Sequence, residues 1–367
     1  MILENEVRLD FSDVLLKPKR STLTSRKDFK LERTFKTKWS SKTFEIVPII
    51  SANMSTGTFQ MAQVFAKNNM MVAIHKFHSP QHWYSQDIKI LRHCCYTIGM
   101  STQEYETYKT VMSNLIQQKK LKDKSDMWLC IDIANGYTKR FSDFVKLIRE
   151  QNPNTVMIAG NVCTSEMVQE LILAGADFVK VGIGPGSACT TRLKTGVGYP
   201  QLSACIECSD AAHGLDAGIV LDGGMTTPGD IAKAFSANAD MVMIGGMFSG
   251  TDEQDGEIKQ RIVQTNIVLK DPKTNAYLGL EEKVEKYKVW YGMSSEHAQA
   301  KHMTGMKSYR TSEGRMEEVP YIGPVQNVID DILGGLRSAG TYIGARGLKQ
   351  FGKCATFLRV TKQHNRF

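Results

Sequence analysis

Residues 155–181 read TVMIAGNVCTSEMVQELILAGADFVKV and contain two short apolar runs on either side of a segment with helical spacing. The runs at 155–159 and 178–181 are rich in β-branched residues, which predicts two strands. Apolar residues recur with the helical period over 166–173, between the two runs. Thr164 offers a hydroxyl that can cap this helix, and Gly175 follows its last turn. The stretch therefore predicts a parallel βαβ unit.

The same alternation of strand and helix recurs along the chain and gives eight predicted strands. Strands are expected at 46–52, 71–75, 96–99, 127–133, 155–159, 178–181, 218–221 and 241–244. Helices are expected at 59–67, 103–118, 139–150, 166–173, 202–212 and 229–237. The fourth to eighth strands each end in a loop rich in polar residues or glycine, which favours a closed barrel over an open doubly wound sheet. We therefore expect an α/β fold, a (β/α)8 or TIM barrel, as a single domain over residues 1–367.

Three segments lie outside this repeat. Residues 8–44 form an extension before the first predicted strand. Residues 249–288 are long and polar, and they begin a lid or flap that we expect at approximately 249–320, after strand eight. A final outer helix is expected at 328–345, interrupted by Gly334 and Gly335 because glycine is a poor helix former.

Composition places the chain among ordinary globular proteins of the cytosol. Its 46 basic and 38 acidic side chains give a net charge of +8, spread along the chain as on a solvated surface. No apolar run approaches the roughly eighteen residues of a membrane span, so we expect no membrane partner. Glu4 and the absence of an apolar core near the N-terminus argue against a secretory signal. Eight cysteines in 367 residues do not resemble a short disulfide scaffold, so we expect reduced thiols and a cytoplasmic location.

The glycine-rich loop GIGPGSACTTR, residues 182–192, follows the sixth predicted strand and contains Cys189. Loops after the strands of a barrel share one face, where active sites form. An inert thiol in a tight turn is the simpler interpretation of an isolated cysteine. Here, backbone amides, Arg192 and the hydroxyls of Thr190 and Thr191 can favour the thiolate, which is the nucleophilic form. We therefore interpret Cys189 as a nucleophile.

Two further loops carry adjacent glycines, LDGGMTTPGD at 221–230 and IGGMFSG at 244–250. They follow strands seven and eight, the corner of a (β/α)8 barrel that often binds phosphate through backbone amides. Asp222 ends strand seven, where its carboxylate can accept hydrogen bonds from ribose hydroxyls. A tight turn is an equally good interpretation of each glycine pair alone, but the occurrence of both pairs favours a phosphate site.

The chain resembles the GMP reductases, within the family that they form with the IMP dehydrogenases. The resemblance spans nearly the whole chain. Besides the cysteine loop and DGGMTTPGD, its motifs are LDFSDVLLKPKRSTLTSR at 9–26, KTGVGYPQLSA at 194–204, YGMSS at 291–295, YRTSEGR at 309–315 and ILGGLRSAGTYIGA at 332–345. It implies an oxidoreductase of purine metabolism and salvage that converts GMP and NADPH into IMP, ammonia and NADP.

The resemblance also implies roles for individual residues. Cys189 attacks C2 of the purine and forms a thioimidate, and Thr191 and Glu313 relay the proton that ammonia needs. The GMP site comprises Ser187, Asp222, Gly223, Gly224, Gly245, Gly246, Tyr291, Gly292, Met293, Ser294, Arg310, Thr311, Ser312 and Gly314. Among these residues, Asp222 is expected at the ribose, and Met293, Ser294 and 310–314 near the base.

NADPH, a potassium ion and a homotetramer are implied in the same way. The nicotinamide side comprises Lys76, Asp132, Ile133, Ala134, Ile183, Gly184, Met293, Tyr309 and Arg310. The adenosine side comprises Ser25, Arg26, Ser338, Ala339, Gly340 and Thr341, and a neighbouring subunit can supply it. The potassium site comprises backbone carbonyls of Gly184, Gly186, Cys189 and Arg192.

Two alternatives remain open. An IMP dehydrogenase shares the cysteine loop, but about fifty residues between strands two and four leave no room for the regulatory domain commonly inserted there. No Arg-Tyr dyad is apparent in the flap either, where Glu313 supplies a carboxylate. A non-catalytic nucleotide-binding or nucleic-acid-binding protein is the other alternative, supported by the basic stretch 17–30. Cys189, Thr191 and Glu313 together favour the enzyme. About twenty residues near 258–280 are an insertion relative to the family pattern.

Overall fold

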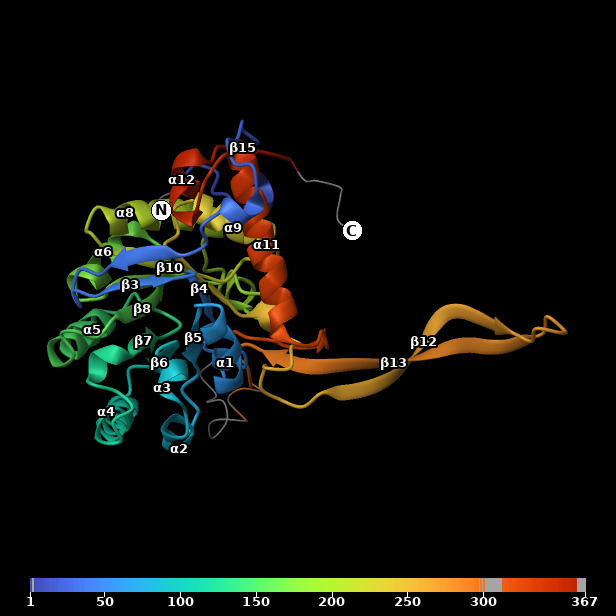
Figure 1. The fold of residues 1–367 in the computed structure, drawn as a ribbon, viewed down its shortest axis with the longest axis horizontal. Coiled ribbons are helices and arrows are strands. Elements are labelled where there is room, and N and C mark those ends of the chain that lie inside the picture. The colour runs from blue at the N-terminus through green and yellow to red at the C-terminus, as the bar shows by residue number, and fades with distance from the viewer. Residues whose placement is uncertain (2, 297, 299, 301–311, 362–367) are drawn as a thin grey trace.

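A closed barrel of eight parallel strands forms the centre of the molecule (Figure 1). The computed structural model describes residues 1, 3–296, 298, 300 and 312–361. The barrel strands are β4 (Ile49–Ser51), β5 (Met71–Ile74), β6 (Cys94–Ile98), β7 (Trp128–Asp132), β8 (Met157–Val162), β9 (Phe178–Val181), β10 (Gly218–Asp222) and β11 (Met241–Ile244). Pairing of Val242 with Ile49 closes the ring between β11 and β4. The predicted (β/α)8 barrel is confirmed.

Helices surround the barrel and connect its strands. They are α1 (Phe59–Lys67), α2 (Pro80–Tyr84), α3 (Ile88–Leu91), α4 (Thr102–Gln117), α5 (Lys139–Gln151), α6 (Ser165–Leu173), α7 (Thr191–Thr195), α8 (Gln201–His213), α9 (Pro228–Ser236), α11 (Val325–Ile343) and α12 (Phe351–Cys354). Thr58 caps α1 and Thr227 caps α9 through their hydroxyls. Thr164 precedes α6 as predicted, but its Oγ1 accepts a hydrogen bond from the Tyr137 hydroxyl instead of capping the helix.

Apolar side chains pack in two regions, one between the barrel and its helices and one inside the barrel. The hairpin of β2 (Arg33–Lys36) and β3 (Thr43–Ile46) belongs to the inner region. Phe35 packs edge-on against Phe178, and Phe44 packs against Trp128 with ring centres 4.7 Å apart. Further along the chain, β1 (Val14–Leu16) pairs with β15 (Phe357–Arg359). The N-terminal extension is therefore an integral part of the barrel core.

Five short 3₁₀ helices complete the connections in the described part of the chain. They are η1 (Phe11–Asp13), η2 (Arg26–Asp28), η3 (Lys124–Asp126), η4 (Gly246–Phe248) and η5 (Leu348–Gln350). Helix α11 was expected to be interrupted by Gly334 and Gly335, and this expectation is wrong. The helix is continuous because Gly335 permits close packing on α9, where an added Cβ would lie 2.6 Å from Cβ of Pro228. Among the described residues, no helix is long and apolar enough to cross a membrane.

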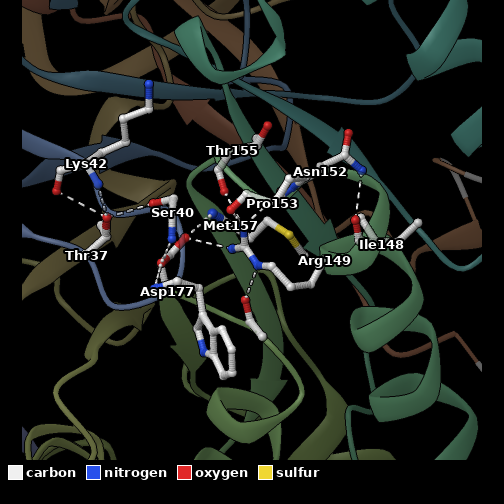
Figure 2. A network of polar contacts seen from close by, with 12 residues as sticks. Thr37, Ser40, Lys42, Ile148, Arg149, Asn152, Pro153, Thr155, Met157 and Asp177 are labelled. Atoms are coloured by element: carbon white, nitrogen blue, oxygen red, sulfur yellow. Dashed lines mark hydrogen bonds and ion pairs between the residues drawn. The ribbon is translucent and has the colours of Figure 1, made fainter.

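A buried ion pair holds α5 to the start of β9 (Figure 2). The Arg149 guanidinium donates to Asp177 Oδ2 at 2.8 Å and also to the carbonyls of Gly175, Asn152, Pro153 and Thr155. Asp177 in turn accepts from the backbone amides of Trp39, Ser40 and Met157. The network therefore ties α5, β8, β9 and the segment between β2 and β3 together.

Replacement of Arg149 by methionine is expected to lower the free energy of unfolding by about 3–5 kcal/mol, because Asp177 is left as an unpaired charge at a fully buried position. Urea titration followed by circular dichroism measures this change. The matched control is Lys139→Met, which breaks the exposed Lys139–Asp143 pair and should leave the free energy of unfolding nearly unchanged. Equal effects of the two substitutions would contradict the prediction.

A long arm projects from the barrel after β11 (Figure 1). It consists of β12 (Lys259–Lys270) and β13 (Tyr277–Tyr291), which pair antiparallel, and β14 (Met316–Pro320) pairs with the root of β13. Most of residues 249–288, expected as the start of a polar lid or flap after strand eight, therefore form a two-stranded hairpin. The exposed strands carry charged residues on both faces, so the apolar alternation that predicts a strand is weak there.

Candidate active site

A cavity of about 480 Å³ opens where the barrel strands end. Asp132 ends β7, Asp222 ends β10, and Gly245 follows β11, so the loops after these strands contribute to one cavity. The root of the arm contributes Trp290 from β13. This is the face on which (β/α)8 barrels form active sites, and the volume suits a nucleotide-sized ligand.

Cys189 lies in this cavity at one end of a chain of hydrogen bonds. Its Sγ donates to Thr191 Oγ1 at 3.3 Å, and Thr191 Oγ1 donates to Glu313 Oε2 at 2.7 Å. All three side chains line the cavity, and Cys189 is partly exposed. The structure therefore connects a thiol to a carboxylate through one hydroxyl, which is an arrangement suited to proton transfer.

Backbone pairing explains how Glu313, distant in sequence, reaches the cysteine loop. Cys189 and Gly314 form an isolated antiparallel bridge, and the Thr190 amide donates to the Glu313 carbonyl at 2.8 Å. Gly292 fits between these segments because an added Cβ would lie 2.8 Å from the Ala188 carbonyl oxygen. Three segments thus meet in one small backbone cluster.

Arg192 does not lie against Cys189, contrary to the expectation that its charge would assist the thiolate. Its guanidinium pairs with Asp10 at 3.3 Å and donates to the Tyr199 carbonyl at 2.5 Å. Its aliphatic part packs against Gly184, where an added Cβ would lie 2.5 Å from Arg192 Cγ. Arg192 therefore fixes the shape of the cysteine loop.

Glycines from the loops after β10 and β11 line one corner of the cavity, together with Ser187 of the cysteine loop. Gly223 and Gly224 have φ angles of 81° and 82°, in the left-handed region that other residues rarely adopt. An added Cβ at Gly246 would lie 2.8 Å from Ser187 Oγ, so the two loops are in close contact. Gly245 also lines this corner, next to Trp290. Such a surface of backbone and hydroxyl suits a phosphate group.

Lys180 connects two carboxylates at the base of the cavity. It lies on β9 with a side chain only 3% exposed, and its Nζ is 2.5 Å from Asp132 Oδ1 and 2.8 Å from Asp222 Oδ2. Burial alone would lower the pKa of Lys180, but the two carboxylates outweigh burial and raise it. Burial would raise the pKa of Asp132, but the charge and hydrogen bond of Lys180 outweigh burial and lower it. Lys180 and Asp132 are therefore held in their charged forms.

The residues expected around NADPH fall into two groups. Asp132, Ile133, Ala134, Ile183, Gly184 and Met293 line the same cavity as Cys189. Lys76 pairs with Glu104 at 2.8 Å. It lies beside the end of β7, as a Cβ added at Gly99 would be within 4 Å of both Lys76 Nζ and the Asp132 carbonyl oxygen. Ser25, Arg26 and 338–341 lie elsewhere, where η2 packs on α11.

In that second group, Gly340 has a packing role, since an added Cβ would lie 2.2 Å from the Phe29 ring.

Several residues expected at the GMP site also line the cavity, namely Ser187, Asp222, Gly223, Gly224, Gly245, Gly246, Gly292, Met293, Ser294 and Gly314. Tyr291 and Ser312 do not line it, because Trp290 occupies the inward position on β13 and Ser312 Oγ donates to the Gly314 carbonyl. Tyr309, Arg310 and Thr311 lie outside the described residues.

The sequence did not single out Lys180, Asn161 or Trp290 as cavity residues. Asn161 donates from Nδ2 to Asp222 Oδ2 at 2.9 Å and to the Gly182 carbonyl at 2.8 Å. Lys180 carried a usable signal, since a lysine inside the apolar strand FVKV needs a buried partner of opposite charge. Asp132 and Asp222, at the ends of nearby strands, could have been matched to it.

Comparison with known proteins agrees with this geometry. The sequence model described as "IMP dehydrogenase / GMP reductase domain" matches residues 8–268 and 274–366. The chain belongs to the IMP dehydrogenase/GMP reductase family. The chain is 48% identical to "GMP reductase 1" of Mus musculus, over 99% of this chain and 98% of that protein. It is 48% identical to "GMP reductase" of Enterobacter sp. (strain 638), over 100% of this chain and 99% of that protein.

Membership of the IMP dehydrogenase/GMP reductase family confirms the expected resemblance and the expectation of an enzyme. A third relative, "GMP reductase 2" of Homo sapiens, is 47% identical over 99% of this chain and 97% of its own. Residues 269–273, between the two matched ranges, fall at the tip of the arm, where β12 ends and β13 begins. These unmatched residues fall within 258–280, the segment expected to be an insertion.

Proposed function

We propose that this chain is a GMP reductase, which converts GMP, NADPH and a proton into IMP, ammonia and NADP. The observation that carries the proposal is the chain of hydrogen bonds from Cys189 through Thr191 to Glu313 inside a nucleotide-sized cavity. The printed names of the relatives agree with it. An enzyme of this kind returns guanine nucleotide to IMP and so serves purine salvage in the cytoplasm.

The covalent step follows from the chemistry of the three side chains. The sulfur of Cys189 forms a bond to C2 of the purine, and the bond from C2 to the exocyclic amine breaks. The thiol proton passes through Thr191 and Glu313 and leaves with the amine as ammonia. The resulting thioimidate is electrophilic at C2, where NADPH, when bound, would supply the hydride that allows the sulfur to leave. The thiolate then takes up a proton, which balances the reaction.

GMP is proposed to lie with its phosphate at the glycine corner and its base at Cys189. Ser187, Gly224 and Gly246 offer the hydroxyl and backbone surface for the phosphate. Asp222 accepts from the ribose hydroxyls, and Met293, Ser294 and Gly314 lie near the base. Two carboxylates bound to the single Lys180 leave acceptor oxygens for hydroxyl donors, which fits this placement.

The residues present also fit NADPH and a potassium ion. Asp132, Ala134 and Gly184 line the same cavity as Cys189, which supports a nicotinamide site there. Ser25, Arg26 and 338–341 are proposed to receive the adenosine side of a cofactor bound to a neighbouring subunit of a homotetramer. For potassium, the carbonyls of Gly186 and Arg192 each accept one backbone hydrogen bond, which leaves a second lone pair for a cation. Carbonyls of Gly184 and Cys189 complete the proposed ligands.

Loss of NADPH absorbance on addition of GMP tests the proposal. GMP with NADPH should give IMP and ammonia in equal amounts, whereas RNA should cause no loss of NADPH. A second mixture, of IMP with NAD, tests the dehydrogenase alternative. Turnover of IMP with NAD, together with no turnover of GMP, would overturn the proposal.

A further inference from the structure

We propose that Lys180 is a positioning residue that holds the ribose carboxylate Asp222 and the cofactor-side carboxylate Asp132 in place around one buried ammonium. This inference rests on the proposed function, because it assigns those two carboxylates to GMP and NADPH. It concerns a residue on the inward side of a barrel strand, one step away from the reacting atoms. Lys180 thereby makes the two ligand sites depend on a single cation.

The geometry of the three residues supports this role. Nζ lies 2.5 Å from Asp132 and 2.8 Å from Asp222, so the two bonded oxygens are at most about 5.3 Å apart, the sum of the two distances. Two carboxylates at this separation repel each other unless a cation lies between them. Asn161 adds one donor to Asp222 and Asn53 adds one to Asp132, but neither carries a charge. The charge of Lys76 acts on Asp132 alone, and the buried thiol of Cys130 faces all three groups. Lys180 is the cation that the described contacts of both carboxylates share.

The strand positions explain why a lysine reaches both partners. Asp132 ends β7 and Asp222 ends β10, with β8 and β9 between them in the barrel. Lys180 lies on β9, one residue before its end, and points into the barrel mouth. Gly160 of β8 permits a close approach, since an added Cβ would lie 2.7 Å from Lys180 Cβ. The lysine is therefore held from both sides.

Removal of the Lys180 ammonium should make GMP binding depend on pH, which simple loss of packing would not do. In Lys180→Met, the two carboxylates are left together without the ammonium between them, and the pair should take up one proton at a higher pH than in the unaltered protein. That proton engages an oxygen that Asp222 needs for ribose hydroxyls. Binding of GMP should therefore become weaker as the pH falls from 8 to 6.

Calorimetric titration with GMP at pH 8 and pH 6 provides the test. The quantity compared is the dissociation constant at pH 6 divided by the dissociation constant at pH 8. Lys180→Met should make this ratio about fivefold to tenfold larger than it is in the unaltered protein. Titration of the GMP phosphate is common to both proteins and cancels in this comparison. The double variant Lys180→Met/Asp132→Asn leaves a single carboxylate, so its ratio should return to within about twofold of the unaltered protein.

Other outcomes are also decisive. An unchanged ratio in Lys180→Met, or no recovery in the double variant, would overturn the role of Lys180. If the single variant does not fold, folding of the double variant supports the role and its failure to fold overturns it. Infrared titration without ligand separates this inference from the proposed function. A protonated-carboxyl band should appear at higher pH in Lys180→Met than in the double variant, whether or not GMP binds.

Discussion

Replacement of Cys189 by alanine is expected to abolish GMP-dependent oxidation of NADPH while GMP still binds. Removal of the nucleophile from a covalent mechanism lowers turnover by at least about 10⁴-fold. The substitution deletes one partly exposed sulfur and keeps the backbone hydrogen bond from the Cys189 amide to the Gly186 carbonyl, at 3.0 Å. The phosphate corner and Asp222 are untouched. Absorbance measures turnover, and calorimetry measures the affinity for GMP.

Cys354 offers a matched control for this variant. It is also partly exposed, but it lies on α12 and contacts the Gly344 carbonyl, away from the residues that line the cavity. Cys354→Ala should therefore keep the turnover of the unaltered protein. Measurable turnover of GMP by Cys189→Ala would reject a covalent mechanism at this residue. Mass spectrometry of the quenched unaltered enzyme should show a purine adduct on Cys189.

Glu313→Gln is expected to lower turnover by about 10²–10⁴-fold, which is the usual contribution of a general acid or base. Glutamine keeps the size of the side chain and an oxygen that can accept from Thr191, but it cannot take up and release the proton. The backbone bond from the Thr190 amide to the Glu313 carbonyl remains, so the flap should still dock. Deamination should slow more than hydride transfer.

An isotope effect distinguishes these two steps. With NADPH deuterated at the transferred position, Glu313→Gln should show a smaller isotope effect on turnover than the unaltered enzyme, because hydride transfer limits the rate less. A larger isotope effect would contradict the proposed role. The control is Glu318→Gln, an exposed glutamate on β14 that pairs with Arg261 of the arm. It should leave turnover unchanged.

The barrel was predictable from the sequence because its strands are short, buried and β-branched. β9 and β11 have the predicted bounds, 178–181 and 241–244. The first predicted strand, 46–52, was divided by the structure. β3 ends at Ile46, Pro48 follows, and β4 begins at Ile49. Proline lacks the amide that a strand needs, and the chain passes there from the β2–β3 hairpin into the barrel.

The candidate site was only partly predictable. The loops with Cys189, Asp222 and Gly245 follow successive strands, so their meeting at one face follows from the fold. The inward position of Trp290 depends on the register of β13 against β14, where Trp290 pairs with Glu317, and no local pattern fixes that register. The arm escaped prediction because solvent surrounds both of its faces, so no buried face imposes an apolar period.

The buried side chain of Lys288 separates the arm into a fixed root and a free outer part. Lys288 lies two residues before Trp290, and its Nζ donates to the carbonyls of Thr251 and Gln254 at 3.0 and 2.6 Å. Beyond Lys288, the pairing of β12 with β13 shifts its register between Gln264 and Val268, so this part of the hairpin accommodates unpaired residues. A change of length near 271–276 should therefore leave the root of the arm, and the cavity beside it, in place.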